Sequence, residues 1–181
     1  MSPSPIHTPL DARLIGSALG ALGPAFAVRV VDTCASTNAE LVEATPADDG
    51  TIHVLLAEAQ TAGRGRRGRR WLSWPGACLT FSSLWRFHQG APVPAGLSLV
   101  AGLALARHLE SLGIAGVQLK WPNDVLILGE KVAGILVELV PGRGRTPAAV
   151  VGMGINVDLP PEAVIPDQPS VGDLAQHLGA P

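Results

Sequence analysis

The stretch that decides the fold spans residues 117–140 and reads VQLKWPNDVLILGEKVAGILVELV, three apolar runs separated by two short turns. These runs and the one that follows them predict four strands, over 117–121, 125–128, 131–140 and 148–157. A two-residue hairpin turn is expected at Gly129-Glu130, and PGRGRTP makes a second turn before the last strand. Consecutive hairpins give antiparallel neighbours. The sequence therefore predicts an α+β fold, with helices on one side of a mixed, mostly antiparallel sheet, rather than a doubly wound parallel fold.

Upstream of this stretch the apolar pattern alternates between helices and strands. A first helix is capped by Asp11 and stopped by a Gly-Pro pair. A second helix begins at Ser-Thr-Asn, residues 36–38, where Thr37 and Glu40 have the spacing of a capping box. Largely apolar runs predict strands over 27–31, 51–59 and 78–84.

Two further helices are expected, one long and one near the end of the chain. The long helix covers 94–112 and is ended by Gly113, with Val100 and His108 among its inward-facing residues. After Asn156 the chain loosens into a proline-rich stretch, and a last helix is expected to begin at Ser170.

The composition bounds the class of protein. With 181 residues, 47% of them apolar and 15% charged, the chain is expected to form one compact soluble domain. No apolar run is long enough for a membrane span and the N-terminus lacks the features of a signal peptide, so a cytoplasmic protein is expected. A net charge of −2 argues against general nucleic-acid binding. Two cysteines without metal-ligand spacing receive no role.

Positive charge is concentrated in residues 63–71, GRGRRGRRW, which we call the Arg/Gly loop. Five arginines and three glycines precede Trp71 there, and the loop follows the C-terminal end of a predicted strand. Arginine forks suit phosphate or carboxylate oxygens, and the Trp71 ring offers a face on which a base could stack. The loop predicts an anion site, and a short RNA-binding loop remains an alternative.

Lysines and strand glycines point to the same site. Of 13 cationic residues 11 are arginine, and the two lysines are Lys120 and Lys131, at the two ends of the predicted hairpin region. A lysine supplies a mobile point charge rather than a planar fork. Glycines at 134, 152 and 154 interrupt strands, which indicates either bulges or the close approach of a ligand that could lie in a slot above them.

Four motifs in order, GRGRRGRRW, KWPNDVLI, KVAGILVE and VGMGINV, with STN near the start, closely resemble those of biotin protein ligases over about residues 30–160. The resemblance implies a fold related to the catalytic domains of class II aminoacyl-tRNA synthetases. It also implies a two-step reaction: the biotin carboxylate attacks the α-phosphate of ATP to give biotinyl-5′-AMP, and a lysine of a biotin carboxyl carrier protein then takes the biotinyl group. Mg2+ is expected to be held mainly by phosphates, and no side-chain metal site is expected.

The resemblance also assigns residues. It implies biotin contacts by Ser36, Thr37, Asn38, Gln60, Gly63, Arg64, Arg66, Lys120, Gly134, Gly152 and Gly154. It implies ATP contacts by Arg66, Arg67, Arg69, Trp71, Lys120, Asn123, Lys131 and Asn156. Lys120 is expected to hold the reacting carboxylate and α-phosphate together, with Lys131 and Arg66 as the other catalytic residues. The Arg/Gly loop is expected to be mobile when empty and to close over the ligand.

The resemblance also implies a domain organisation and a partner, and two alternative functions stay open. Residues 1–181 are read as one catalytic domain that lacks a preceding helix-turn-helix domain and ends before the family's SH3-like C-terminal domain. The expected partner is the biotin carboxyl carrier domain of acetyl-CoA or another acyl-CoA carboxylase, with neither DNA nor membrane, in a monomer or weak homodimer. The alternatives are a lipoate or octanoate ligase or transferase and, in another class, an RNA-binding module that uses the Arg/Gly loop.

Overall fold

The computed structural model describes residues 8–140, 146–165 and 170–178. Its helices are α1 (Ala12–Ala18), α2 (Thr37–Ala44) and α3 (Leu97–Ser111), with 3-10 turns at Gly20–Ala25 and Arg66–Gly68. Its strands are β1 (Phe26–Cys34), β2 (Ile52–Gln60), β3 (Cys78–Arg86), β4 (Val117–Lys120), β5 (Asp124–Ile127), β6 (Glu130–Val140) and β7 (Ala148–Asn156). Residues 141–145 of the predicted PGRGRTP turn lie outside the described residues.

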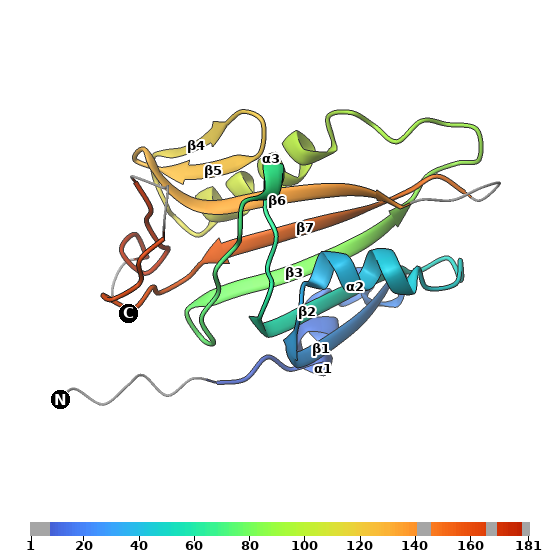
Figure 1. The fold of residues 1–181 in the computed structure, drawn as a ribbon, viewed down its shortest axis with the longest axis horizontal. Helices are drawn as coiled ribbons and strands as arrows, with labels where there is room; N and C mark the ends of the chain where they lie inside the picture. The colour runs from blue at the N-terminus through green and yellow to red at the C-terminus, as the bar shows by residue number, and fades with distance from the viewer. Residues whose placement is uncertain (1–7, 141–145, 166–169, 179–181) are drawn as a thin grey trace.

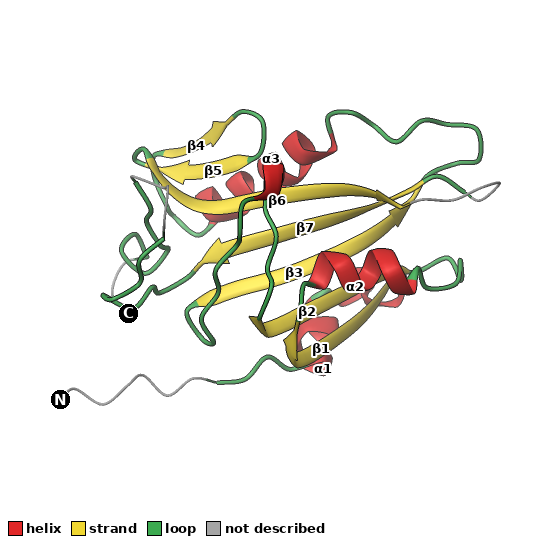
Figure 2. Ribbon diagram, viewed as in Figure 1, coloured by secondary structure: helices red, strands yellow, loops and turns green. Residues whose placement is uncertain are grey.

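The seven strands form one sheet in the order β1-β2-β3-β7-β6-β5-β4 (Figures 1 and 2). Only β1 and β2 run parallel, and every other neighbouring pair is antiparallel. The predicted mixed, mostly antiparallel sheet is therefore confirmed. The last described strand, β7, lies at the centre of the sheet between β3 and β6.

Helices cover both faces of the sheet, so the prediction that they lie on one side is wrong. Val150 of β7 belongs to a buried cluster with Leu41 of α2, whereas Val151 belongs to a cluster with Leu105 of α3. Successive strand residues point to opposite faces, so α2 and α3 lie on opposite faces. Figure 2 shows α2 in front of the sheet and α3 behind it. The physical reason is that the central strands are apolar at nearly every position and bury both faces.

Two local predictions change by one residue. The hairpin turn between β5 and β6 is Leu128-Gly129, because Ile127 pairs with Glu130 and both turn residues have positive φ, 50° and 90°. Positive φ at both central residues is the type I′ arrangement that fits strand twist. Helix α2 is capped by Ser36, whose Oγ accepts from the Ala39 N–H, so Thr37 is the first helical residue rather than the cap.

The long helix is present, and Gly113 follows it with a φ of 85° as expected. Its buried face, however, consists of Gly102, Leu105, Ala106 and Leu109, and Val100 and His108 are exposed. A Cβ at Gly102 would lie 3.3 Å from side chains of β4 and β6. The helix therefore lies close to β4 and β6 at Gly102, and its buried face is rotated away from the stripe that the sequence predicted.

The helix predicted to begin at Ser170 is absent from the described residues there. Val171 instead makes a parallel bridge with Lys131, and Asp173 accepts from the Gln176 N–H within a turn.

Helix α1 begins at its predicted cap, because Asp11 accepts from the N–H groups of Arg13 and Leu14.

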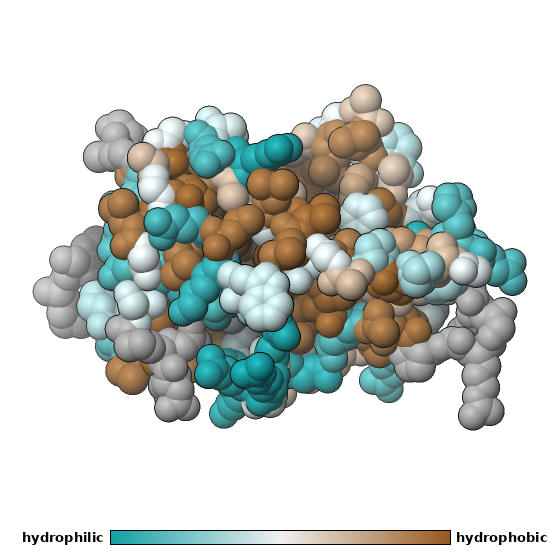
Figure 3. Space-filling view, turned by 90° about the horizontal axis from the view of Figure 1, so that it is seen from above, coloured by the Kyte–Doolittle hydropathy of each residue, from teal (hydrophilic) through white to brown (hydrophobic). Residues whose placement is uncertain are grey.

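One face of the molecule carries many exposed apolar side chains. Figure 3, viewed from the side of β4 and β5, shows apolar side chains gathered there. The exposed large apolar residues of α3 and β4 are Leu99, Val100, Leu103 and Leu119. Within the described part of the chain, no helix has the length and apolarity needed to cross a bilayer.

Candidate ligand-binding pocket

The pocket floor is a row of small residues across the sheet. Gly134 pairs with Gly154, and Gly154 pairs with Thr80 of β3. Two positions along β7, Gly152 pairs with Ser82. Gly152 and Gly154 follow Val150 at every second position of β7, so they lie on the same face of the sheet as Val150, the face that carries α2.

A cavity of about 430 Å³ lies above this floor. The predicted residues that line it are Ser36, Thr37, Asn38, Gln60, Arg64, Arg66, Arg67, Arg69, Trp71, Lys120, Asn123, Lys131, Gly134, Gly152 and Gly154. They come from α2, β2, β4, β6 and β7, from the Arg/Gly loop, and from Ser36 and Asn123, which directly precede α2 and β5, and the fold brings all of them to one place. Asp124 and Ser82 also line the cavity, although the sequence analysis did not single them out.

Two predicted residues lie elsewhere. Gly63 is in the stem of the Arg/Gly loop, where an added Cβ would collide with the Trp71 carbonyl oxygen. Asn156 is 2% exposed, and its amide donates to the carbonyl oxygens of Gly172, at 2.9 Å, and Lys131, at 3.4 Å. Because its side chain anchors the 170–174 segment, Asn156 is not among the cavity-lining residues, and the expected ATP contact stays a prediction without support from this placement.

The glycine floor is covered by two of the protein's own side chains. A Cβ on Gly154 would collide with the Trp71 indole, and a Cβ on Gly152 would collide with the Asn38 amide. At Gly134 the nearest Trp71 atom is 3.2 Å from the Cβ position. The glycines therefore seat Trp71 and Asn38 directly on the sheet, and a ligand would contact these side chains above the floor.

The two lysines differ in how firmly they are held. Lys131 Nζ lies 3.0 Å from Asp124 Oδ1 and 5.9 Å from the centroid of the Trp71 ring, and its side chain is 19% exposed. Lys120 lines the cavity but is exposed. Lys131 therefore presents a fixed positive charge beside Trp71, whereas the Lys120 charge is free to move.

The Arg/Gly loop is a small hairpin that crosses in front of β3, β7 and β6 (Figure 1). The Trp71 N–H donates to the Gly63 carbonyl at 2.9 Å, and the Gly65 N–H donates to the Arg69 carbonyl at 2.7 Å. Arg67 and Gly68 turn the chain at the tip with positive φ. The hairpin places arginine side chains over the cavity, and its mobility in the absence of ligand stays a prediction.

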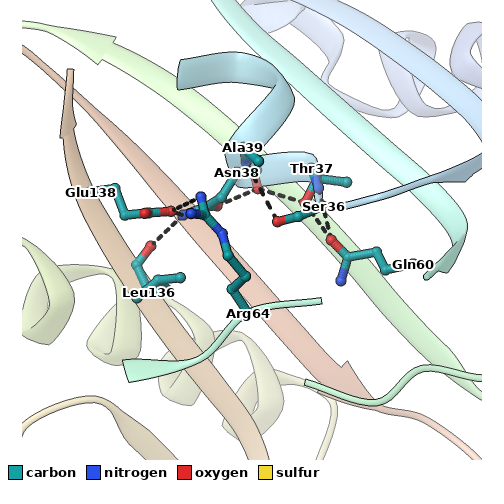
Figure 4. A network of polar contacts seen from close by, with 9 residues as sticks. Ser36, Thr37, Asn38, Ala39, Gln60, Arg64, Leu136 and Glu138 are labelled. Carbon is teal, nitrogen blue, oxygen red and sulfur yellow. Dashed lines mark hydrogen bonds and ion pairs between the residues drawn. The ribbon is translucent and has the colours of Figure 1, made fainter. Parts of the chain in front are cut away.

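A chain of hydrogen-bonded polar side chains lies beside the cavity and runs from the buried Thr37, Ser82 and Asn38 to the partly exposed Glu138 and the exposed Arg64 (Figure 4). Thr37 and Ser82 hydroxyls are 2.7 Å apart, and Ser82 donates to Asn38 Oδ1 at 2.5 Å. Asn38 Nδ2 donates to Glu138 Oε2 at 2.8 Å, and Arg64 donates to the same oxygen at 2.8 Å. A sequence signal was available for Glu138, which stands between apolar residues of β6, but not for Ser82, which has polar neighbours such as Ser83 in β3.

The described residues offer no cluster of three or more histidine, cysteine, aspartate or glutamate side chains that could hold a metal ion. The carboxylate in the cavity, Asp124, is already paired with Lys131.

Neither of the two cysteines lines the cavity, and both are buried. Burial, with a smaller effect from Glu40, raises the pKa of Cys34 to about 11, so its thiol stays protonated at neutral pH. Catalysis through a covalent thioester at Cys34 is therefore disfavoured, and the cavity is suited to binding and charge neutralisation.

Comparison with known proteins gives consistent results. The sequence pattern described as "Biotin/lipoate A/B protein ligase family" matches residues 29–156. The chain is 44% identical over 155 residues to the "Bifunctional ligase/repressor BirA" of Salmonella typhimurium, covering 86% of this chain and 47% of that protein. It is 43% identical over 178 residues to the "Biotin--[acetyl-CoA-carboxylase] ligase" of Mycobacterium tuberculosis, covering 93% and 64%.

Solved structures are similar in fold. The biotin protein ligase from Aquifex aeolicus in complex with biotin and ATP superposes with a TM-score of 0.69 at 32% identity, covering 84% of this chain and 61% of that chain. The chain thus spans less than two thirds of the length of each of these relatives.

Proposed function

Because the chain belongs to the biotin/lipoate A/B protein ligase family, we propose that it is an ATP-dependent biotin protein ligase. In the first step, a biotin carboxylate oxygen attacks the α-phosphorus of ATP, forming biotinyl-5′-AMP and releasing pyrophosphate. In the second step, the amine of a lysine on a biotin carboxyl carrier domain attacks the carbonyl carbon, and AMP leaves. Support comes from the names of the relatives and from the neighbouring structure described with biotin and ATP.

The single observation that carries the proposal is that the cavity has uncharged polar groups on one side of its floor and lysine charge on the other. On the uncharged side, Asn38 lies on Gly152 and is linked through Ser82 to Thr37, which contacts Gln60. On the other side, Lys131 and Trp71 lie beside Gly134. Lys120 and arginines of the Arg/Gly loop line the same cavity. A ligand that fits has a neutral polar ring at one end and anionic groups at the other, as biotin and its adenylate do.

We assign the neutralisation of the carboxylate and phosphate charges to the two lysines and to Arg66. Lys131, held by Asp124 beside Trp71, supplies a fixed positive charge where the carboxylate meets the α-phosphate. The mobile Lys120 follows the charge that develops between the two groups, and Arg66 neutralises phosphate oxygens. Such a reaction depends on positioning and neutralisation more than on a covalent protein group.

The Arg/Gly hairpin has a second task in this proposal. A mixed anhydride is hydrolysed by water, so a closed hairpin protects it until the carrier arrives. Mg2+ would supply charge neutralisation at the phosphates when bound, and Asn123 and the loop arginines Arg67 and Arg69 line the cavity that would hold them. The carrier domain of an acyl-CoA carboxylase in the cytoplasm is the proposed acceptor.

Calorimetric titration tests the proposal. The 181-residue chain is titrated with biotin and then with a non-hydrolysable analogue of biotinyl-5′-AMP. We expect the analogue to bind at least about 100-fold more tightly than biotin, because it fills both sides of the cavity at once. A folded sample that binds neither ligand would overturn the proposal.

The same titration distinguishes a biotin ligase from the main alternative, a ligase for lipoate or octanoate. A lipoate or octanoate ligase would bind lipoyl or octanoyl adenylate analogues more tightly than the biotinyl analogue. The uncharged polar side of the cavity favours biotin, because a dithiolane ring or an alkyl chain offers no acceptor to the N–H groups of Gln60, whose Oε1 is already bonded to Thr37.

A further inference from the structure

The polar chain beside the cavity ends at Glu138 of β6. One carboxylate oxygen, Oε2, accepts from both Asn38 Nδ2 and Arg64 Nη2, each at 2.8 Å (Figure 4). A carboxylate offers acceptors only. The hydrogens of both partners must therefore point toward Glu138, and the direction of hydrogen-bond donation is fixed at this residue.

That direction fixes the amide of Asn38. Its Nδ2 faces two acceptors, Glu138 Oε2 and the Leu136 carbonyl oxygen at 3.2 Å, so its Oδ1 faces the opposite way, toward Ser82. Ser82 donates to that oxygen at 2.5 Å. Asn38 is 3% exposed and sits directly on Gly152, so the surrounding side chains hold it in place.

The direction then passes to the cavity through Thr37. The single hydrogen of the Ser82 hydroxyl is used on Asn38, so Thr37 must donate its own hydrogen to Ser82 Oγ, 2.7 Å away. Gln60 Oε1, 3.2 Å from the Thr37 hydroxyl, accepts instead from the Thr37 backbone N–H at 2.8 Å. The Thr37 hydroxyl oxygen is left as an acceptor, and the Gln60 amide is left with its N–H groups.

We propose that Glu138 is a positioning residue that sets this direction, so that Thr37 presents an acceptor and Gln60 a donor to the ligand. The inference rests on the proposed function, because the ureido group of biotin carries an N–H and a C=O side by side. If these hydrogen bonds ran in the opposite direction, the Thr37 hydroxyl would donate toward the ligand N–H, and two donors would face each other. Arg64 binds the same oxygen of Glu138, so closure of the Arg/Gly hairpin strengthens the same direction.

Two variants and two ligands test the proposal by titration calorimetry. The ligands are biotin and biotin methylated on its ureido nitrogens, which cannot donate there. In Glu138→Leu we expect biotin Kd to rise at least about tenfold and the penalty for methylation to shrink several-fold, because Thr37 is no longer committed as an acceptor. Glu138→Gln keeps an acceptor oxygen between two donors, so we expect biotin affinity within about threefold of the wild type and an unchanged penalty.

The outcomes separate the possible roles of Glu138. A methylation penalty that is the same in wild type and Glu138→Leu overturns the proposal, as does a Glu138→Gln variant as weak as Glu138→Leu, since the effect would then come from the charge beside Arg64. A fall in unfolding free energy with equal loss of both ligands would assign Glu138 to stability alone and also overturn it. If the folded wild-type chain does not bind biotin, the proposed function itself fails.

Discussion

Single glycines decide how Trp71 sits in the pocket, and Gly154 and Gly134 differ sharply in this respect. An added Cβ would collide with the indole at Gly154 but would lie 3.2 Å from it at Gly134. We expect Gly154→Ala to displace Trp71 and weaken biotinyl-adenylate analogue binding at least about tenfold, a loss of about 1.4 kcal/mol. Gly134→Ala is the matched control and should lose much less. Calorimetric Kd values for both variants check this, and equal losses would contradict it.

The mobile lysine gives a cleaner test of charge than the fixed one. Lys131→Ala would leave Asp124 without its ion-pair partner, which confuses catalysis with stability. Lys120 is exposed, so Lys120→Ala should leave the unfolding midpoint unchanged while adenylate formation falls by about 100-fold or more. Biotin-dependent release of pyrophosphate measures this loss. A folded Lys120→Ala variant with normal release would remove Lys120 from the mechanism.

The sequence predicted most residues of the pocket, because the four motifs and STN carry them in order. It did not predict Glu138, since a polar residue within an apolar run shows only that something pairs with it, nor Ser82, which is one of several polar residues in β3. The identity of that partner depends on which strands are neighbours. The contact of Trp71 with Gly154 was equally hidden, because about 80 residues of sequence separate them.

At the scale of elements, the turn between β5 and β6 holds a residue poorly suited to its backbone. Leu128 has a φ of 50° and is 72% exposed, and it precedes Gly129 with a φ of 90°. Left-handed conformation costs most side chains about 1–2 kcal/mol, and asparagine tolerates it best. We expect Leu128→Asn to raise the free energy of unfolding by about 1 kcal/mol.

A denaturant titration of this variant measures the effect, and Leu128→Ala is its control. Alanine also removes the contact between the Leu128 side chain and Gly116 but keeps an unfavourable φ. If the two variants are equally stable, the turn conformation is not the source of any gain.

The strands were easier to predict than the faces they present. Apolar runs located β2, β3, β6 and β7 to within about two residues, because burial of both faces makes such runs long. The side on which each helix packs follows from single positions instead. Gly102 lies on the buried face of α3 although it was not in the predicted stripe, and the cap of α2 is Ser36 rather than Thr37.

Across the whole molecule, alkaline stability is expected to depend on the buried thiols. Burial raises the pKa of Cys34 to about 11 from an ordinary value of 9.0, and burial also raises the pKa of Cys78. A raised pKa in the folded state means that stability is fully present below pH 9 and is lost as the pH rises through 11. The sequence contains no tyrosine that would titrate in the same range.

Urea unfolding at intervals from pH 8 to pH 11 checks this expectation. The free energy of unfolding should fall over that range, and it should fall less steeply in Cys34→Ala than in the wild type. Parallel curves for the two proteins would show that the thiol does not contribute.

The position of β7 has a consequence for how the protein comes into being. β7 is the last described strand to be synthesised, yet it is the bridge that joins β1-β2-β3 to β6-β5-β4 and carries two floor glycines. Until it emerges from the ribosome, the nascent chain holds two half-sheets with exposed inner edges and no binding site. The sheet is then expected to close only after β7 has been synthesised, and until then the unfinished edges at β3 and β6 are where the nascent chain is open to wrong strand pairing.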